Sequence, residues 1–232
     1  MAIYHFQMRV VRRSKGQSAV AVAARRSGER LYDRRCGLHV RPDSGSSPPA
    51  VAEIILPPNA PAWMSNREEL WNATETAERR RDAQLAREVE VALPLELEDE
   101  QAIALARDFV QREFIQRGMI ADLTIRLGGN NPYANAMLTM REVTPAGFGR
   151  KVIAWNRREL LTQWREQWAT IANEYLERAG HAVRIDHRRK DDQAAAVHLG
   201  KAASAMQRRG LKHDRLRRLE EMQNGSPAKD EA

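Results

Sequence analysis

The alternation of apolar and polar positions along the chain predicts several short strands. Five segments are rich in β-branched and aromatic residues or alternate strictly, as half-buried strands do: residues 2–11, 51–56, 88–93, 120–127 and 134–141. In the sequence EVEVAL at residues 88–93, the period of two places Glu88 and Glu90 on one face and the valines on the other. A further, very short strand is predicted at residues 183–185.

Apolar positions at helical spacing, with capping residues beside them, predict the helices. An alanine-rich run at residues 18–35 begins with Ser18 as its N-cap, and a Ser-x-x-Glu capping box at residues 65–68 begins a helix that continues to about Ala86. Three later helical segments are predicted, the first two closed by glycines and the last followed by a disordered tail: residues 97–116, residues 155–179, and most of the chain from residue 193.

These elements combine into an α+β fold. The glycine-rich turn at residues 128–132 joins two predicted strands into a hairpin, and the other strands also favour hairpin-type neighbours. We therefore expect a central, mostly antiparallel five-stranded sheet flanked by helices. Trp164, Trp168 and Tyr175 form a stripe on one helix, which is more typical of a buried core than of a base-stacking surface.

The charge balance favours an anionic partner. The 232 residues contain 38 Lys and Arg against 31 Asp and Glu, which gives a net charge of +7 and a pI near 10.0. Such a balance suits nucleic acid or an anionic membrane surface, although aromatic residues at 6% do not favour a base-stacking platform. The single cysteine, Cys36, excludes an intrachain disulfide, and the sequence contains neither a signal-peptide pattern nor a membrane-spanning run. We expect a cytoplasmic protein.

A series of ordered sequence blocks resembles the MobA/MobL mobilisation relaxases over roughly residues 1–210. The blocks include RSKGQSA at 13–19, RSGE at 26–29, ILPPNAP at 55–61, REVEVALP at 87–94, RGMIAD at 117–122 and GGNNPYANAMLT at 128–139. The resemblance implies the relaxase (HUH endonuclease) fold, a bacterial protein, and a DNA-binding domain at residues 1–200. A C-terminal helix and a disordered tail are expected at residues 201–232.

The chemistry of that family requires residues that this chain replaces. A relaxase attacks a phosphodiester with a tyrosine hydroxyl, while a divalent metal held by histidines polarises the phosphate. The resemblance places Arg25 at the tyrosine position, Glu88 at the acidic position, and Arg126, Tyr133 and Asn135 at the three histidine positions. Arginine offers no lone pair to a metal or to phosphorus, and one amide with one carboxylate makes a weak transition-metal site. We therefore expect no catalytic set and no metal cofactor.

The resemblance and the replacements together favour a relaxase-like protein of plasmid mobilisation that binds DNA without nicking it. The expected partner is single-stranded or hairpin DNA at a transfer origin, with other relaxosome proteins as further candidates. Two alternatives stay open. One is an active relaxase that forms its phosphotyrosine intermediate through a relocated tyrosine, Tyr32 or Tyr133. The other is a protein-interaction module of the relaxosome.

Basic residues near the replaced positions are the candidate DNA contacts. They are Arg9, Arg12, Arg13, Lys15, Arg25, Arg26 and Arg126. A guanidinium matches the geometry of phosphate with a bidentate fork, so Arg126 is predicted to take part in a cationic phosphate clamp where the family holds its metal. The alternative is that Arg126 pairs with Glu88 and closes the pocket.

Overall fold

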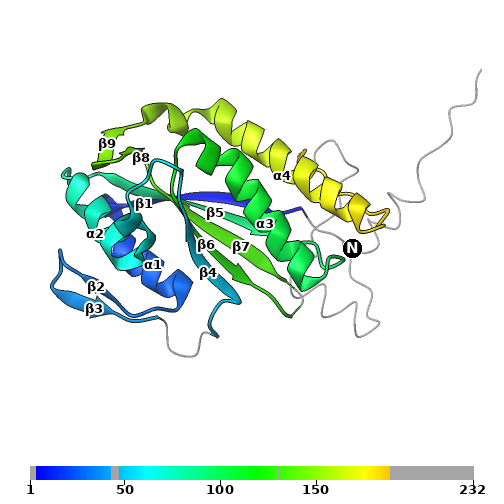
Figure 1. Ribbon diagram of the computed structural model, residues 1–232, viewed down its shortest axis with the longest axis horizontal. Helices are drawn as coiled ribbons and strands as arrows, with labels where there is room; N and C mark the ends of the chain where they lie inside the picture. The colour runs from blue at the N-terminus through cyan, green and yellow to red at the C-terminus, as the bar shows by residue number, and fades with distance from the viewer. Residues whose placement is uncertain (1–3, 43–46, 130, 189–232) are drawn as a thin grey trace, which may run out of the picture. The chain divides into compact units, whose positions relative to one another are not determined.

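A five-stranded antiparallel sheet forms the centre of the computed structural model, which describes residues 4–42, 47–129 and 131–188 (Figure 1). Every neighbouring pair of its strands is antiparallel. The strand order is β1 (Phe6–Arg12), β5 (Gln84–Ala92), β7 (Tyr133–Leu138), β6 (Ala121–Arg126) and β4 (Val51–Ile55). The predicted α+β class, with a five-stranded antiparallel sheet flanked by helices, is confirmed.

Each face of the sheet is covered by its own pair of helices. Figure 1 shows helix α1 (Ala19–Ser27) beside α2 (Arg67–Ala77), and α3 (Asp99–Glu113) beside α4 (Arg158–Arg178). The alternation of side chains along β5 sorts its residues between these two layers. Ala86 packs in the cluster formed with α1 and α2, whereas Val89 belongs to the cluster formed with α3 and α4.

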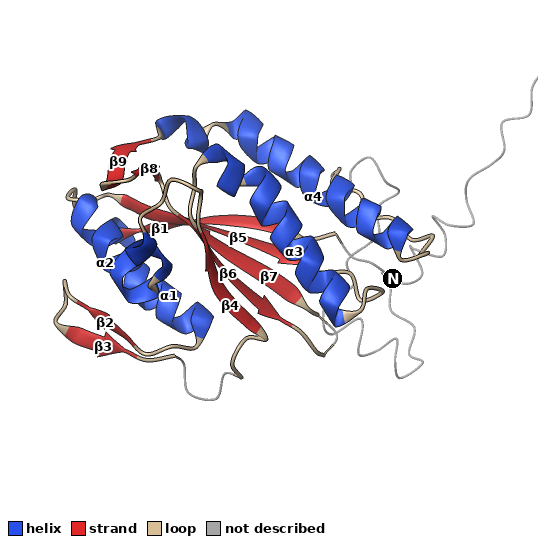
Figure 2. Ribbon diagram, in the orientation of Figure 1, coloured by secondary structure: helices blue, strands red, loops and turns tan. Residues whose placement is uncertain are grey.

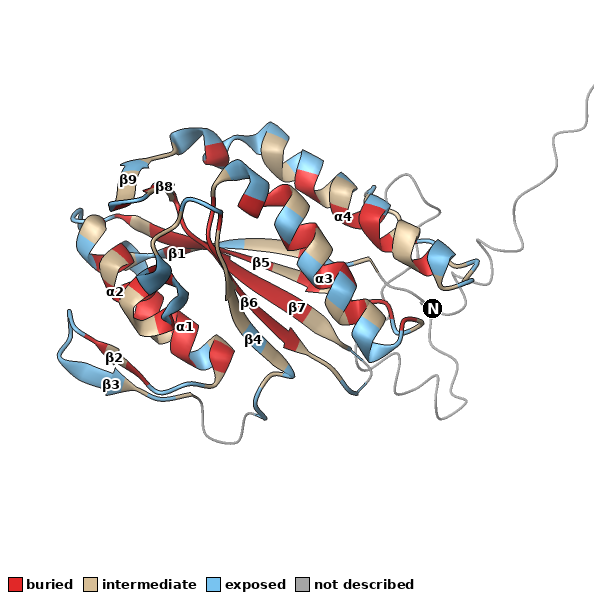
Figure 3. Ribbon diagram, in the orientation of Figure 1, coloured by how far each residue is buried: buried red, intermediate tan, exposed pale blue. Residues whose placement is uncertain are grey.

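The layer formed by α3 and α4 holds an aromatic core. Phe109 lies 5.1 Å from Trp168 and 5.3 Å from Phe114, measured between ring centroids, and Phe114 lies 5.2 Å from Trp164. Both tryptophans are fully buried, and Tyr175 packs beside them partly buried. The expectation that this stripe is core is confirmed. Figure 3 shows the buried residues gathered along the central strands and on the helix faces that cover them.

The first helix is shorter than predicted. Gly28 has a φ of +77° and its N–H bonds to the carbonyl of Ala24, which is a C-terminal cap in the left-handed region. The chain then turns into a two-stranded ribbon, β2 (Leu31–Asp33) with β3 (Leu38–Val40). The prediction of one helix over residues 18–35 is therefore wrong, and Tyr32 lies on a strand opposite His39.

The second helix also begins later and ends earlier than predicted. Asn66, rather than Ser65, is its N-cap, because the Asn66 side chain accepts from the Glu69 N–H at 3.0 Å. The helix ends at Ala77, and residues 84–86 belong to β5. Three consecutive arginines and an aspartate at residues 79–82 give a helix no apolar face to bury, whereas Leu85 and Ala86 are buried in the sheet.

Smaller differences follow from local chemistry. Helix α3 begins with a capping box between Glu98 and Gln101, and Gly118 closes a short 3₁₀ turn after it. Helix α4 begins at Arg158, after the 3₁₀ turn that contains Trp155. Residues 183–185 form no strand. Instead, the Asn173 side chain holds the backbone of Ile185 with two hydrogen bonds.

Besides β2 and β3, a second hairpin of the structure was not predicted. Strands β8 (Arg141–Thr144) and β9 (Gly147–Lys151) form a separate two-stranded sheet directly after β7 (Figure 2). The helix expected from residue 193, the disordered tail and the domain boundary at residue 200 lie outside the described residues. Within the described part of the chain, no helix combines the length and apolarity that a membrane span requires.

Candidate functional site

A cavity of about 540 Å³ lies between α1 and the sheet. We call it the arginine cavity, and it is lined by Arg9, Val10, Val11, Gln17, Val22, Arg25, Arg26, Glu88, Arg126 and Tyr133. Four of these residues are arginines and one is a carboxylate. They come from α1, from β1, β5, β6 and β7, and from the loop before α1, so the cavity is assembled by contacts between distant parts of the sequence.

The strand register places the key side chains on the sheet face that carries α1. Arg9 on β1 is paired with Glu88 on β5, and Arg126 on β6 is paired with Tyr133 on β7. Residues directly opposite one another in antiparallel strands point to the same face. Asn135 is two residues beyond Tyr133 on β7 and so lies on that face as well.

Glu88 is buried at the floor of the arginine cavity and is held by two partners. Arg26 forms an ion pair with its Oε1, and the Asn135 Nδ2 donates to the same oxygen at 3.1 Å. Arg26 also lies 3.8 Å from Glu90. The Oδ1 of Asn135 is buried and accepts no hydrogen bond from any residue that the structure describes.

Arg126 does not pair with Glu88, which was one of the two predictions for its side chain. Its Nη1 donates to the carbonyl of Ser47, and the ion pair of Glu88 is formed with Arg26 instead. The suggestion that Arg126 pairs with Glu88 is therefore wrong. The reason is geometric, since Arg126 lies at the end of β6 whereas Arg26 projects from the helix that covers Glu88.

Three arginines of the cavity have no carboxylate partner among residues 4–42, 47–129 and 131–188. Arg9 donates to the amide oxygen of Gln7 at 2.6 Å, and Arg126 donates to a backbone carbonyl. Arg25 is exposed, and no described residue pairs with its guanidinium. The cavity wall therefore carries positive charge that the described protein groups do not neutralise.

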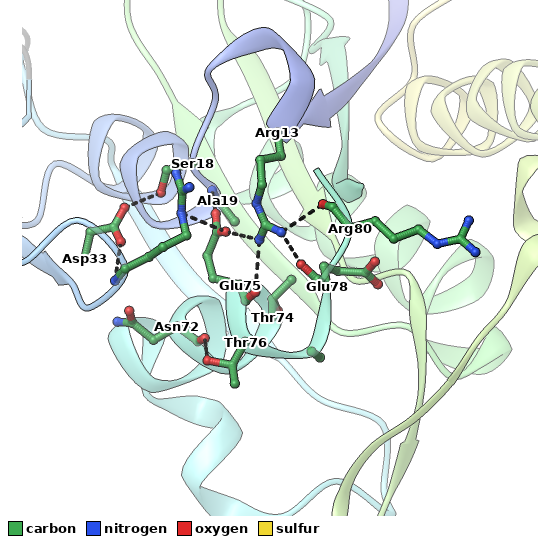
Figure 4. Close-up of polar contacts among 12 residues, drawn as sticks. Arg13, Ser18, Ala19, Asp33, Asn72, Thr74, Glu75, Thr76, Glu78 and Arg80 are labelled. Atoms are coloured by element: carbon green, nitrogen blue, oxygen red, sulfur yellow. Dashed lines mark hydrogen bonds and ion pairs between the residues drawn. The ribbon is translucent and has the colours of Figure 1, made fainter. Parts of the chain in front are cut away.

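Helix α1 is held at its N-terminus by buried carboxylates (Figure 4). Glu75 accepts from the Ala19 N–H at 2.7 Å and from the Arg13 guanidinium at 2.6 Å. Ser18, the N-cap of α1, donates to Asp33 at 2.6 Å. Acidic groups at the start of a helix satisfy its free N–H groups and oppose the positive end of its dipole.

Arg13 is turned toward α2 rather than toward the arginine cavity. Its guanidinium points to the C-terminal end of α2, where it also donates to the backbone carbonyl of Glu75 and, just after the helix, to those of Glu78 and Arg80 (Figure 4). Arg13 is not among the residues that line the arginine cavity, and neither are Arg12 and Lys15. Arg13 therefore ties the end of β1 to α2.

The C-terminal end of α1 is tied to the sheet through an ion-pair chain whose inner pair, Arg67 with Asp122, is buried. Glu29, just after the helix, pairs with Arg67, whose Nε lies 2.9 Å from an oxygen of Asp122 on β6. The Trp71 indole N–H donates to the same carboxylate at 2.8 Å. Burial opposes the charge of Arg67, but hydrogen bonding and attraction to Asp122 outweigh it and raise the pKa of Arg67.

The residues at the floor of the arginine cavity do not fit a divalent metal. The described residues contain no group of three or more His, Cys, Asp or Glu placed to hold an ion. Glu88 is already neutralised by Arg26. An amide oxygen and a tyrosine offer weak ligands in place of imidazole, and arginine offers none.

Comparison with known proteins identifies the chain. The sequence profile of the MobA/MobL family matches residues 17–209. The chain belongs to the MobA/MobL family. Residues that the resemblance to this family singled out lie together in the structure, because Arg25, Glu88, Arg126 and Tyr133 line the arginine cavity and Asn135 bonds to Glu88.

Related MobA/MobL proteins carry names from DNA transfer. A probable conjugal transfer protein TraA of Sinorhizobium fredii is 33% identical over 260 residues, covering 96% of this chain and 23% of the relative. Mobilization protein A of Escherichia coli is 34% identical over 238 residues, covering 93% of this chain and 32% of the relative. The chain thus spans about a quarter of the length of the TraA relative.

A solved structure has the same fold. The protein described under "Molecular Basis of Vancomycin Resistance Transfer in Staphylococcus aureus" is 34% identical and superposes with a TM-score of 0.74. The likeness covers 81% of this chain and 100% of that one. The predicted relaxase fold is therefore confirmed.

Sequence reasoning did not find every contact that shapes the site. Arg26, predicted as a DNA contact, forms an ion pair with Glu88 that the sequence did not predict. The anchors Arg67, Asp122 and Glu75 were not singled out at all, although Asp122 belongs to the RGMIAD block. Tyr32, the suggested relocated nucleophile, does not line the arginine cavity, whereas Tyr133 does.

Proposed function

We propose that this MobA/MobL protein binds single-stranded or hairpin DNA of a transfer origin and does not nick it. The observation that carries the proposal is that Arg25, at the family's tyrosine position, lines the same cavity as Arg126 and Tyr133, at two of its histidine positions. The protein would act in plasmid mobilisation in the bacterial cytoplasm, with other relaxosome proteins as candidate partners.

The absence of nicking rests on the chemistry of the replacements. A relaxase-type cut needs a hydroxyl nucleophile beside the phosphate and a cation to polarise it. Arg25 has no hydroxyl and cannot act as an oxygen nucleophile. The donor set around Glu88 does not fit a metal. The residue at the family's tyrosine position and the residues at its metal-ligand positions are thus both replaced at one site, which supports a binding role.

DNA binding is supported by the surplus of positive charge at the cavity. Phosphate contacts supply most of the affinity of proteins for DNA, and arginine is the side chain best suited to make them. The related proteins of S. fredii and E. coli are named for conjugal transfer and mobilisation. Because the chain spans only part of these relatives, any further activity they have is not carried over.

A second basic surface adds to the proposed DNA path. A groove of about 1080 Å³, here the α2–β9 groove, lies between the end of α2 and the β8–β9 hairpin, and its wall includes Trp63, Arg79, Arg80, Arg141 and Lys151. Arg141 and Lys151 both bind Glu78, each at 2.9 Å. Arg79 and Arg80 are exposed, and the half-exposed Trp63 offers a flat apolar surface for a base or sugar.

The test is a gel assay with labelled single-stranded and hairpin oligonucleotides from the DNA that flanks its gene. Each reaction contains Mn²⁺, Mg²⁺ or EDTA. We expect a native shift that does not depend on the metal, and no shortened strand on a denaturing gel. A metal-dependent cut would overturn the proposal in favour of an active relaxase. Failure to shift any oligonucleotide at low salt would favour a protein-interaction module instead.

A further inference from the structure

The charges of the arginine cavity do not balance. Its wall carries four arginines and one carboxylate, and that carboxylate is taken by Arg26. Arg9, Arg25 and Arg126 face the cavity with no acidic partner within the part of the chain that is described. Like charges around a partly enclosed space repel one another, and an anion placed between them removes the repulsion.

The arrangement of the donors suits a phosphate. Arg25 projects from α1, and Arg126 lies at the end of β6 on the sheet beneath it. Arg9 reaches the same cavity from β1. Guanidinium groups that approach from different elements can each offer a two-pronged donor to a different pair of phosphate oxygens.

We propose that the arginine cavity binds a backbone phosphate of DNA without a metal, and that Glu88 opposes this binding as an internal competitor for Arg26. The proposal rests on the proposed function, since it assumes that the chain binds DNA. Arg25 and Arg126 are the principal phosphate donors. Glu88 and the incoming phosphate compete for the Arg26 guanidinium.

The change in DNA affinity on removal of the Glu88 charge distinguishes this phosphate site from a metal-dependent catalytic site. In a metal-dependent site, a carboxylate beside the ligands helps to hold the cation, so its loss weakens the assembly. Here the carboxylate faces a phosphate of the same charge and neutralises a donor that the phosphate needs. Removal of its charge should therefore strengthen DNA binding.

The neighbourhood of Glu88 makes a clean substitution available. Asn135 Oδ1 is buried without a donor, while its Nδ2 bonds to Glu88. In Glu88→Gln the new amide can donate to Asn135 Oδ1, and its carbonyl can still accept from Arg26. The substitution removes one charge and keeps a full set of hydrogen bonds, so we expect the fold to be retained.

The experiment measures the affinity for a fluorescein-labelled single-stranded 20-mer by anisotropy, in EDTA and across a series of NaCl concentrations. The variants are Arg25→Gln, Arg126→Gln and Glu88→Gln. Arg178→Gln is the matched control, because Arg178 is exposed on α4 and lines neither the arginine cavity nor the α2–β9 groove. Circular dichroism confirms that each variant is folded. Two further variants, Arg25→Lys and Arg126→Lys, keep the positive charge but remove the bidentate guanidinium.

We expect Arg25→Gln and Arg126→Gln each to weaken binding about 10-fold and to lower the salt slope by about one. The lysine variants should fall between these and the wild type. Glu88→Gln should strengthen binding several-fold, and Arg178→Gln should change it little. Addition of Mn²⁺ should not raise the affinity.

The outcomes separate the two proposals. If the wild type fails to bind the 20-mer at low salt, the proposed function fails. If the wild type binds but the cavity variants match Arg178→Gln, the phosphate site is overturned while the DNA-binding function stands. Weaker binding by Glu88→Gln, or a requirement for Mn²⁺, overturns the role of Glu88 as a competitor.

Discussion

Arg26 on α1 forms an ion pair with the buried Glu88 on β5, at the place where the family's metal chemistry would be expected. This contact joins the helix that carries Arg25 to the strand that carries Glu88, the residue predicted to occupy the family's acidic position. It neutralises the carboxylate from within the protein. The pair therefore gives the cavity a stable floor without a bound cation.

The position of Arg13 leads to the first prediction. Arg13 is paired with the buried Glu75 and three backbone carbonyls, so Arg13→Met should lower the free energy of unfolding by about 3 kcal/mol. The affinity of the folded protein for single-stranded DNA should stay within about 2-fold of the wild type. By contrast, Arg25→Met should leave the free energy of unfolding nearly unchanged and weaken the binding of single-stranded DNA about 10-fold. Urea denaturation and anisotropy measure the two quantities, and a large affinity loss in Arg13→Met would restore its predicted DNA contact.

The buried ion pair of Arg67 with Asp122, near the end of α1, leads to the second prediction. Asp122→Ala removes the acceptor of the Trp71 N–H and leaves the buried Arg67 guanidinium with only the exposed Glu29, which should cost about 3–5 kcal/mol of unfolding free energy. The control is Glu53→Gln, which removes the exposed pair with Arg107 and should cost less than about 1 kcal/mol. Equal effects of the two substitutions in urea denaturation would show that the chain does not anchor the helix.

The aromatic layer gives a third prediction with a control of the same residue type. Trp168 is fully buried among Phe109 and its neighbours, so Trp168→Ala should cost about 3–5 kcal/mol. Trp63 is 41% exposed, and Trp63→Ala should cost less than about 1 kcal/mol. Thermal unfolding followed by circular dichroism compares the two. A similar fall in melting temperature would argue against the described packing of α4.

Tyr4 gives the protein a dependence of stability on alkaline pH. Burial raises the pKa of Tyr4 to about 12 from a reference value of 10.0, against the smaller, opposite effect of Arg165. The folded state therefore keeps a proton that the unfolded state loses, and this part of the stability is complete below pH 10 and is lost as the pH rises toward 12. The Tyr4 hydroxyl donates to the Arg165 carbonyl at 3.2 Å. Urea midpoints between pH 9 and pH 11.5 should fall more steeply in the wild type than in Tyr4→Phe, and parallel curves would contradict the assignment.

The sequence predicted the sheet better than the helices around it. Period-two alternation placed Glu88 and Glu90 on one face, and the glycine turn at residues 128–132 predicted the hairpin of β6 and β7. The end of α1 at Gly28 was missed because helical spacing continues past it, although a glycine in such a run is also a stop signal. The β8–β9 hairpin was missed because its residues alternate poorly and include two glycines.

The sequence predicted which residues gather at the site, but not which of them form ion pairs with one another. The family's sequence blocks located Arg25, Arg126 and Tyr133, and the fold brings them to one cavity. Which arginine would meet Glu88 depends on where α1 crosses the sheet, and that is set by contacts such as Arg67 with Asp122. These contacts join residues that are far apart in the chain, so local patterns do not reveal them.

The most direct test of the central claim is a search for a covalent protein–DNA adduct that survives SDS. The wild type and a restored variant, carrying Arg25→Tyr, Arg126→His, Tyr133→His and Asn135→His together, are incubated with single-stranded DNA from the region flanking the gene in Mn²⁺. We predict no adduct for the wild type and a metal-dependent adduct for the restored variant. An adduct on the wild type, located by the tryptic peptide that carries the DNA, would contradict the account.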